Sequence, residues 1–216
     1  MPGEWRALYR KTFEAILRKP SSRDGYSAQT VRRAESRLGA KLPRALRDYY
    51  LLIGRHALNR VFNQLLAPNR IEISGGHLVF QEENQAVVVW GTKVSSEAND
   101  PAVFVANILN DGTTGPWLPE KARCSQFLSA MLCWQAVCGG LPHRACAERV
   151  GKPALQRVKR CWPLLGRTWQ LAAYASNGKV VCVVKDGKRS FLEVAGRTEK
   201  DVTAIEATVG LEMVAV

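Results

Sequence analysis

The sequence predicts an α+β protein in which N-terminal helices are followed by a mostly antiparallel sheet with further helices packed against it. Two periodicities in its 216 residues support this fold class. Up to residue 54, apolar residues recur every three or four positions, as they do on one face of a helix. From residue 71 they alternate with polar residues, which is the pattern of a half-buried strand.

Three helices are expected before the first strand. The first covers residues 4–18, and the second covers residues 28–38 with Ser27 as its N-cap. Pro43 opens the third, because a proline in the first helical turn gives up only an N–H that would lack a partner there. Gly54 ends this third helix.

The remainder of the chain contains seven segments with the strand pattern: residues 71–73, 77–82, 87–92, 103–107, 169–176, 179–185 and 188–194. The last three segments are joined by Asn177-Gly178 and Asp186-Gly187. Such dipeptides adopt the positive φ angles of tight hairpin turns, so they predict an antiparallel meander.

Three later helices are also expected. Ser125 caps one that runs to about Cys138, and a weaker helical pattern follows Pro153. Thr198 caps the last helix, with Asp201 at the second position of a capping box.

The net charge of +12 is distributed unevenly along the chain. Residues 1–60 carry net +9 and residues 141–216 carry net +6, whereas residues 61–140 carry net −3. A basic chain suits nucleic acid or an acidic protein partner. The asymmetry predicts that different faces of the protein meet different neighbours.

The chain is expected to be cytoplasmic, although export by a route without a signal peptide stays open. Residues 1–19 are charged throughout and lack the apolar core of a secretory signal. No apolar run reaches the roughly 18 residues that a membrane-spanning helix needs.

Six cysteines are present, and they are Cys124, Cys133, Cys138, Cys146, Cys161 and Cys182. The sequence contains no CxxC pair and no histidine at zinc-finger spacing. We therefore expect free thiols that pack as small apolar residues, with no metal and no cofactor.

Three segments, taken in order, carry a family resemblance. The first is residues 31–54, VRRAESRLGAKLPRALRDYYLLIG, in which a helix bearing Glu35 is followed by Leu-Gly, Leu-Pro, an aromatic pair and an apolar run. The second is residues 77–92, HLVFQEENQAVVVWGT, which has the pattern of a hairpin. The third is residues 100–104, DPAVF, followed by a helical pattern over residues 124–132.

This ordered set resembles the SUKH superfamily, which includes yeast cell-wall-synthesis regulators of the Smi/Knr family and bacterial toxin-immunity proteins. The resemblance implies a single domain over residues 1–216, with a helical extension at 1–25 and the best-matching core at 28–138. Residues 141–216 would add a helix, the hairpin meander and the terminal helix.

The resemblance also implies a function without catalysis, in which the chain binds a cognate toxin domain and blocks it by occlusion. We expect a basic toxin domain, such as a nuclease, to meet the acidic middle of the chain. The partner-binding residues expected in the second and third segments and in the loop between them are Glu82, Glu83, Asn84, Gln85, Trp90, Glu97, Asp100 and Pro101. Trp90 also suits a core aromatic, and Glu83 also suits a solvated turn.

Two other functions remain open from the sequence. Nucleic acid could bind two basic stripes, one formed by Arg32, Arg33, Arg37, Arg44 and Arg47, and the other by Lys152, Arg157, Lys159 and Arg160. A cysteine-dependent enzyme or redox sensor would need a thiol of lowered pKa, and Cys124 beside Arg123 is the candidate.

Overall fold

The computed structural model describes residues 4–94 and 98–216. Within these ranges the helices are α1 (Glu4–Ile16), α2 (Ala28–Leu38), α3 (Arg44–Leu52), the 3₁₀ turn η1 (Ala57–Arg60), α4 (Cys124–Gln135), the π turn η2 (Ala136–Gly140), α5 (Lys152–Cys161) and α6 (Glu199–Val209). The strands are β1 (Gln64–Leu65), β2 (Glu72–Ser74), β3 (His77–Glu82), β4 (Val88–Lys93), β5 (Ala102–Asn107), β6 (Leu118–Arg123), β7 (His143–Ala147), β8 (Leu164–Arg167), β9 (Leu171–Ser176), β10 (Lys179–Asp186), β11 (Arg189–Gly196) and β12 (Val214–Ala215).

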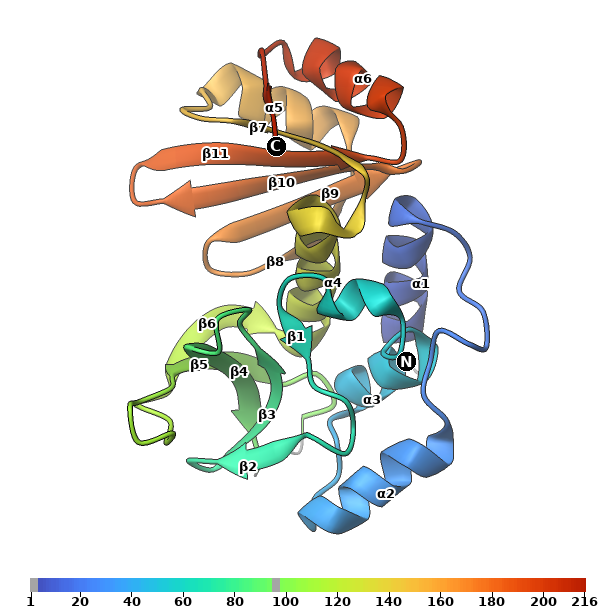
Figure 1. Cartoon of the computed structure of the whole chain (residues 1–216), viewed down its shortest axis with the longest axis vertical. Helices are drawn as coiled ribbons and strands as arrows, with labels where there is room; N and C mark the ends of the chain where they lie inside the picture. Colours follow the sequence, from blue (N-terminus) through green and yellow to red (C-terminus); the bar gives the residue numbers. More distant parts are fainter. Residues whose placement is uncertain (1–3, 95–97) are drawn as a thin grey trace.

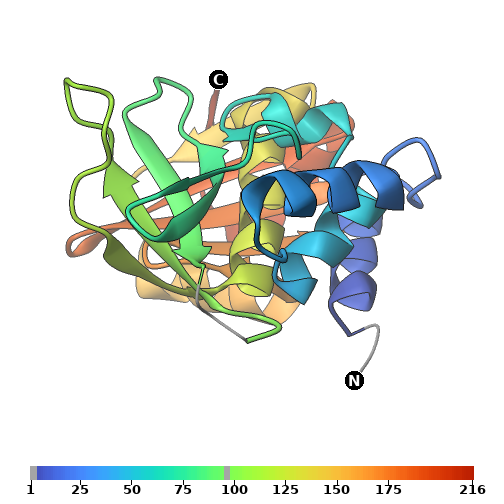
Figure 2. The ribbon, with the colours of Figure 1, turned by 90° about the horizontal axis from the view of Figure 1, so that it is seen from below.

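The strands form two antiparallel sheets, which confirms the predicted α+β class. The first sheet has the order β1-β3-β4-β5-β6, with β2 also pairing with β3, and the second has the order β12-β7-β11-β10-β9-β8. In Figure 1, α4 lies between the two sheets, and α5 and α6 cover the outer face of the second sheet. Figure 2 shows α1, α2 and α3 gathered on one side of the first sheet. None of the helices in the described part of the chain has the length and apolar character needed to cross a membrane.

Helix α4 is the central element of the fold. Ten of its twelve residues are buried, so the helix is enclosed on all sides rather than along one stripe. It contacts strands of both sheets as well as α1 and α3. Its side chains therefore belong to one core that joins the N-terminal helices, the first sheet and the inner face of the second sheet.

The start of α4 differs from the prediction. Ser125 is not its N-cap, because the helix begins one residue earlier and Ser125 lies within its first turn. Asp100, which precedes β5 and lies 25 residues earlier in the sequence, accepts hydrogen bonds from this first turn. Its Oδ1 accepts a hydrogen bond from the Ser125 backbone N–H at 2.8 Å, and its Oδ2 accepts one from the Ser125 hydroxyl at 2.6 Å. A carboxylate is favourable there because helix N-termini carry free N–H groups and a partial positive charge.

The second sheet is buried on both faces. Along β10, Cys182 belongs to the core around α4, whereas Val181 and Val183 belong to a separate cluster beneath α5 and α6. The alternation follows from the two-residue period of a strand. The continuous apolar run of β10 is typical of a strand covered on both sides.

The local turn and cap signals in this sheet are mostly confirmed. Asn177 and Gly178 have φ angles of 51° and 80°, as a tight hairpin requires. Thr198 and Asp201 form the expected capping box. In the second hairpin, Asp186 instead pairs with Arg189 as the last residue of its strand, so the turn begins one residue later than predicted.

The last turn of α1 is completed by residues from the C-terminal part of the chain. Arg197 donates a hydrogen bond from Nε to the Ile16 carbonyl at 2.9 Å, and the Gly178 N–H donates to the Ala15 carbonyl at 2.7 Å. The final carbonyls of a helix have no partner within the helix. These two contacts therefore attach the end of α1 to the second sheet.

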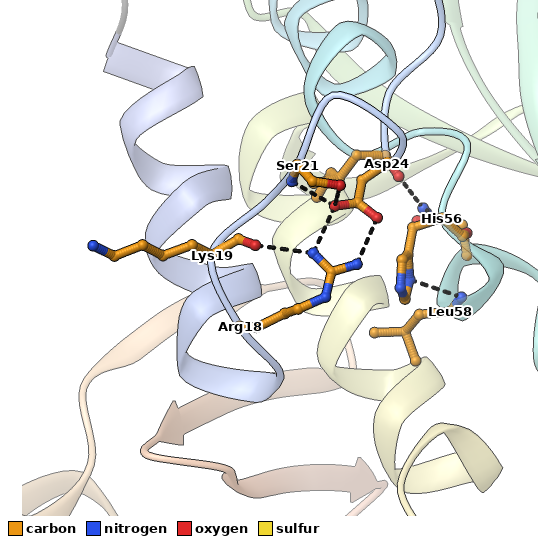
Figure 3. Close-up of polar contacts among 8 residues, drawn as sticks. Arg18, Lys19, Ser21, Asp24, His56 and Leu58 are labelled. Carbon is orange, nitrogen blue, oxygen red and sulfur yellow. Dashed lines mark hydrogen bonds and ion pairs between the residues drawn. The ribbon is translucent and has the colours of Figure 1, made fainter.

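An ion pair between half-exposed Arg18 and buried Asp24 fixes the loop between α1 and α2 (Figure 3). Arg18 donates to both carboxylate oxygens of Asp24, at 2.8 and 2.9 Å. Ser21 donates to the same carboxylate from its backbone N–H and its hydroxyl. The Arg55 N–H donates to the Asp24 carbonyl at 2.8 Å, which ties the loop to the segment after α3. The Arg18 guanidinium and these hydrogen bonds hold the pKa of Asp24 well below its usual range.

We expect Asp24→Asn to lower the free energy of unfolding at pH 7 by about 2 kcal/mol. The hydrogen bonds to the charged carboxylate stabilise the fold, and solvent around half-exposed Arg18 reduces the contribution of the ion pair. The pKa of Asp24 is lower in the folded protein than in the unfolded chain, where it is near 3.9. The stabilisation by the Asp24 carboxylate is therefore fully present above the unfolded pKa and is lost progressively as the pH falls from there through the folded pKa. Urea unfolding at pH 7, 4 and 2.5 should show a shallower acid loss in the variant. If the free energy of unfolding falls equally with pH in the two proteins, the ion pair of Asp24 does not stabilise the fold as described.

Strand β8 crosses α4 at Gly166, where the two backbones are in direct contact. A Cβ atom at this position would lie inside the contact distance of the Ala130 nitrogen and the Gln126 carbonyl oxygen, both in the backbone of α4. Neither atom can rotate away, because each belongs to the helix itself. Because glycine has no Cβ atom, it is the residue that lets the backbone of β8 lie this close to the backbone of α4.

We expect Gly166→Ala to lower the free energy of unfolding by about 3 kcal/mol through overpacking. Gly115→Ala is the matched control, because a Cβ there would meet its nearest atom at 3.4 Å, an ordinary contact. Chemical denaturation of the two variants beside the unmodified chain measures the difference. Equal stability of the two variants would show that β8 can move away from α4 without loss.

Candidate functional site

A cleft of about 680 Å³ opens between the first sheet and the β8–β9 end of the second sheet. Its aromatic lining consists of Phe62, Trp90, Trp134 and Trp169. We call it the tryptophan cleft. A mainly apolar hollow of this size with a few polar groups is the usual form of a binding site.

One wall of the cleft is a row of side chains on the first sheet, which the pairing of β4, β5 and β6 places side by side. Trp90 of β4 lies opposite Val105 of β5, and Val105 lies opposite Leu118 of β6. Directly opposed residues project to the same face of a sheet. All three side chains line the cleft, and Leu118 remains 62% exposed at its edge.

The other wall comes from the second sheet and α4. Leu171 and Val184 are paired across β9 and β10, and both line the cleft. Trp169, in the loop between β8 and β9, is 54% exposed. Met131 and Trp134 of α4 complete this wall.

Contacts between β6 and the β8–β9 loop connect the two walls. Glu120 accepts a hydrogen bond from Trp90 Nε1 at 3.2 Å and another from the Trp169 backbone N–H at 3.3 Å. The Lys121 ammonium lies over the Trp169 ring, 3.0 Å from its centroid. Lys121 adopts a φ of 55°, in the left-handed region that is unfavourable for a residue with a side chain.

A buried glutamine of α4 positions the loop that carries Phe62 into the cleft. Gln135 accepts a hydrogen bond from the Phe62 N–H at 2.7 Å and donates to the carbonyls of Asn59 and Asn63. The Phe62 and Trp134 rings meet edge to face with centroids 6.3 Å apart. The amide thus satisfies three backbone groups of η1 and of the segment that joins it to β1.

The structure brings two of the predicted site residues into this cleft, Glu83 and Trp90. Glu82 instead forms an ion pair with Arg70 at 3.5 Å. Asn84 and Gln85 are exposed in the turn between β3 and β4, where Glu83 accepts a hydrogen bond from the Gln85 N–H at 2.7 Å.

The remaining predicted residues do not join this group. The Asp100 carboxylate is engaged at the start of α4, and Pro101 is buried. Glu97 lies outside the described residues. The sequence did not indicate Trp134, Trp169 or Lys121 as site residues, because their proximity arises only from the packing of the two sheets on α4.

The cysteines are free in the structure, and Cys124, Cys133 and Cys182 are buried as expected. Burial raises the pKa of the Cys124 thiol well above its ordinary value and raises that of Cys133 to about 12. A nucleophilic thiol requires the opposite shift. Cys161 is exposed on α5. Across residues 4–94 and 98–216, no group of three metal-ligating side chains is arranged to hold an ion.

Several residues of the two predicted basic stripes make internal contacts. Arg37 donates to backbone carbonyls of the segment before β2, Arg44 pairs with Asp48, and Arg157 donates to the carbonyl of the last residue of α6. The stripe residues that are exposed and appear in none of the ion pairs of the described chain include Arg32, Arg33, Lys152, Lys159 and Arg160. The stripes are thus less continuous than their spacing suggests.

Comparison with models of protein families, with curated proteins and with solved structures gave no match. The resemblance to the SUKH superfamily therefore stays a prediction from the sequence.

We expect one fast-reacting thiol in the native protein, that of Cys161, because the pKa of each of the other five is raised by burial. Titration with an aromatic disulfide reagent should show this fast phase in the native chain and six thiols after denaturation. Cys161→Ser should abolish the fast phase. A fast phase that persists in this variant would identify another reactive cysteine and favour the redox hypothesis.

Proposed function

We propose that the chain is a non-enzymatic protein-binding module that holds its partner through the tryptophan cleft. The observation that carries this proposal is that two exposed apolar side chains, Leu118 and Trp169, line one cleft together with three further aromatic side chains. Isolated exposed apolar residues are normal on a protein surface. Two of them at one apolar hollow suit an interface.

Protein interfaces depend on a few anchors in desolvated pockets, surrounded by a polar rim. The tryptophan cleft has this composition, since Trp90 and Trp134 lie within it and Glu83 and Glu120 supply carboxylates. The contacts of Glu120 with both walls preorganise the hollow before any partner arrives, which lowers the entropy lost on binding.

We further propose that the partner is a bacterial toxin domain and that binding blocks it by occlusion. The resemblance of residues 28–138 to the SUKH superfamily supports this role. The charge pattern supports a basic partner, such as a nuclease domain, because the acidic middle of the chain supplies the first sheet and α4, which form most of the cleft. The proposal needs no catalytic residue, metal or cofactor.

The test is to identify a toxin gene beside the gene of this chain, and then to measure protection of cells against that toxin together with binding of the purified pair. We expect Trp169→Ala and Leu118→Ser each to weaken binding at least about 30-fold and to abolish protection, as anchors of about 2 kcal/mol or more would. Both side chains are more than half exposed, so the fold should tolerate their loss.

Leu164→Ser is the matched control, because Leu164 is 47% exposed and does not belong to the described lining of the cleft. Its binding should stay within about threefold of the unmodified chain. If the two cleft variants protect as well as this control, the partner does not use the cleft and the proposed function fails.

A further inference from the structure

We propose that the tryptophan cleft receives an arginine side chain of the partner rather than an apolar one. This inference rests on the proposed function and specifies what the partner must present. It comes from four properties of the cleft, which are its aromatic faces, its excess of carboxylates, the lysine that the chain already places on one of its rings, and a buried amide oxygen without a hydrogen-bond partner within the described residues.

The aromatic faces suit a planar cation. Four aromatic side chains line the cleft, and three of them are tryptophans, the strongest partners for a cation over a ring. An arginine guanidinium is flat, weakly hydrated and able to stack on such faces. The hydrogen bond from Trp90 Nε1 to Glu120 holds one of these rings in place.

The charges that line the cleft favour a cation as well. Among the described lining residues, Glu83 and Glu120 are carboxylates and Lys121 is the one cation. This is a local excess of negative charge on a chain of net +12. A carboxylate has about four acceptor positions, and the hydrogen bonds seen here use one at Glu83 and two at Glu120.

Lys121 shows that the Trp169 ring accepts a cation. Its ammonium lies 3.0 Å from the ring centroid although its own backbone is in the unfavourable left-handed region. The partner's arginine would compete with this internal cation for the ring and for the neighbouring carboxylates. Removing the internal charge should therefore strengthen the binding of a cation, which a purely structural role of Lys121 does not predict.

A buried amide adds a reason to prefer arginine to lysine. Asn63 lines the cleft at 4% exposure, and its side-chain oxygen has no hydrogen-bond partner within the described residues. A guanidinium carries five N–H donors in a fixed fork, whereas an ammonium has three on one atom. Glu83 and Glu120 carry further acceptors among the described lining residues of the same cleft.

The experiment uses the full chain, labelled with ¹⁵N, and the indole N–H resonances of its six tryptophans. The probe is N-acetyl-arginine amide, and the control probe is N-acetyl-citrulline amide, which has the same shape without the charge. Trp→Phe variants assign the resonances. We expect the arginine probe to shift the Trp134 and Trp169 signals saturably, and the citrulline probe to bind at least about fivefold more weakly.

Two variants sharpen the test. Lys121→Met keeps the aliphatic stem and removes the charge, and it should tighten binding of the arginine probe about threefold. Glu83→Gln should weaken it by a similar factor. Lys93→Met is the matched control, because Lys93 also lies over an aromatic ring, 5.4 Å from the Phe104 centroid, but is not among the described residues that line the cleft. Its binding should not change.

Equal binding of the two probes would overturn the proposal, as would shifts confined to tryptophans outside the cleft or unchanged binding in Lys121→Met. Tighter binding of N-acetyl-tryptophan amide than of the arginine probe would also overturn it in favour of an apolar anchor. In each of these cases, loss of protection in Trp169→Ala would leave the proposed function standing. If that variant also protects normally, both fail.

Discussion

The burial of α4 on every side is the constraint on which the rest of the structure depends. Ten of the twelve residues of α4 are buried, and this burial is achieved because both sheets and the N-terminal helices close around it. Its ends also lie away from solvent. The first turn is satisfied by Asp100, and the last residues lead into the π turn η2, where Gln135 binds the loop before β1. The absence of a side chain at Gly166 lets the second sheet approach closely enough to complete the enclosure.

The tryptophan cleft follows from this arrangement. Both sheets pack on this one helix, and residues of both sheets and of the helix line the hollow between them. Here those residues are aromatic and aliphatic, and Glu120 and Lys121 of the edge strand β6 reach the opposite wall. The same helix that organises the core thus fixes the spacing of the two surfaces that would hold a partner.

Local signals in the sequence predicted local structure well. The bounds of α2 and β3, the Asn177-Gly178 hairpin and the Thr198 capping box were correct because each depends on residues a few positions apart. Strands β1, β6, β7, β8 and β12 were not predicted. In β6 and β8 the reason is that Pro119 and Gly166 disfavour strands unless packing demands them. The role of Asp100 was not foreseen because its partner is 25 residues away. For the same reason, only Glu83 and Trp90 of the cleft were predicted, whereas Trp169 was not.

The attachment of α1 to the second sheet constrains how the chain can fold during its synthesis. The hydrogen bond from Arg197 to Ile16 joins residues 181 positions apart. At about 5–20 residues per second, a ribosome needs on the order of 10–40 seconds to make the intervening segment. During that time the end of α1 lacks Arg197, and α4 and the strands of the second sheet that cover its buried face are added only in the later part of the interval. Helix α1 can therefore pack against α3 early, whereas its last turn completes its native contacts only after Arg197 has been made, and a chaperone could bind the uncovered part of α1 in this interval.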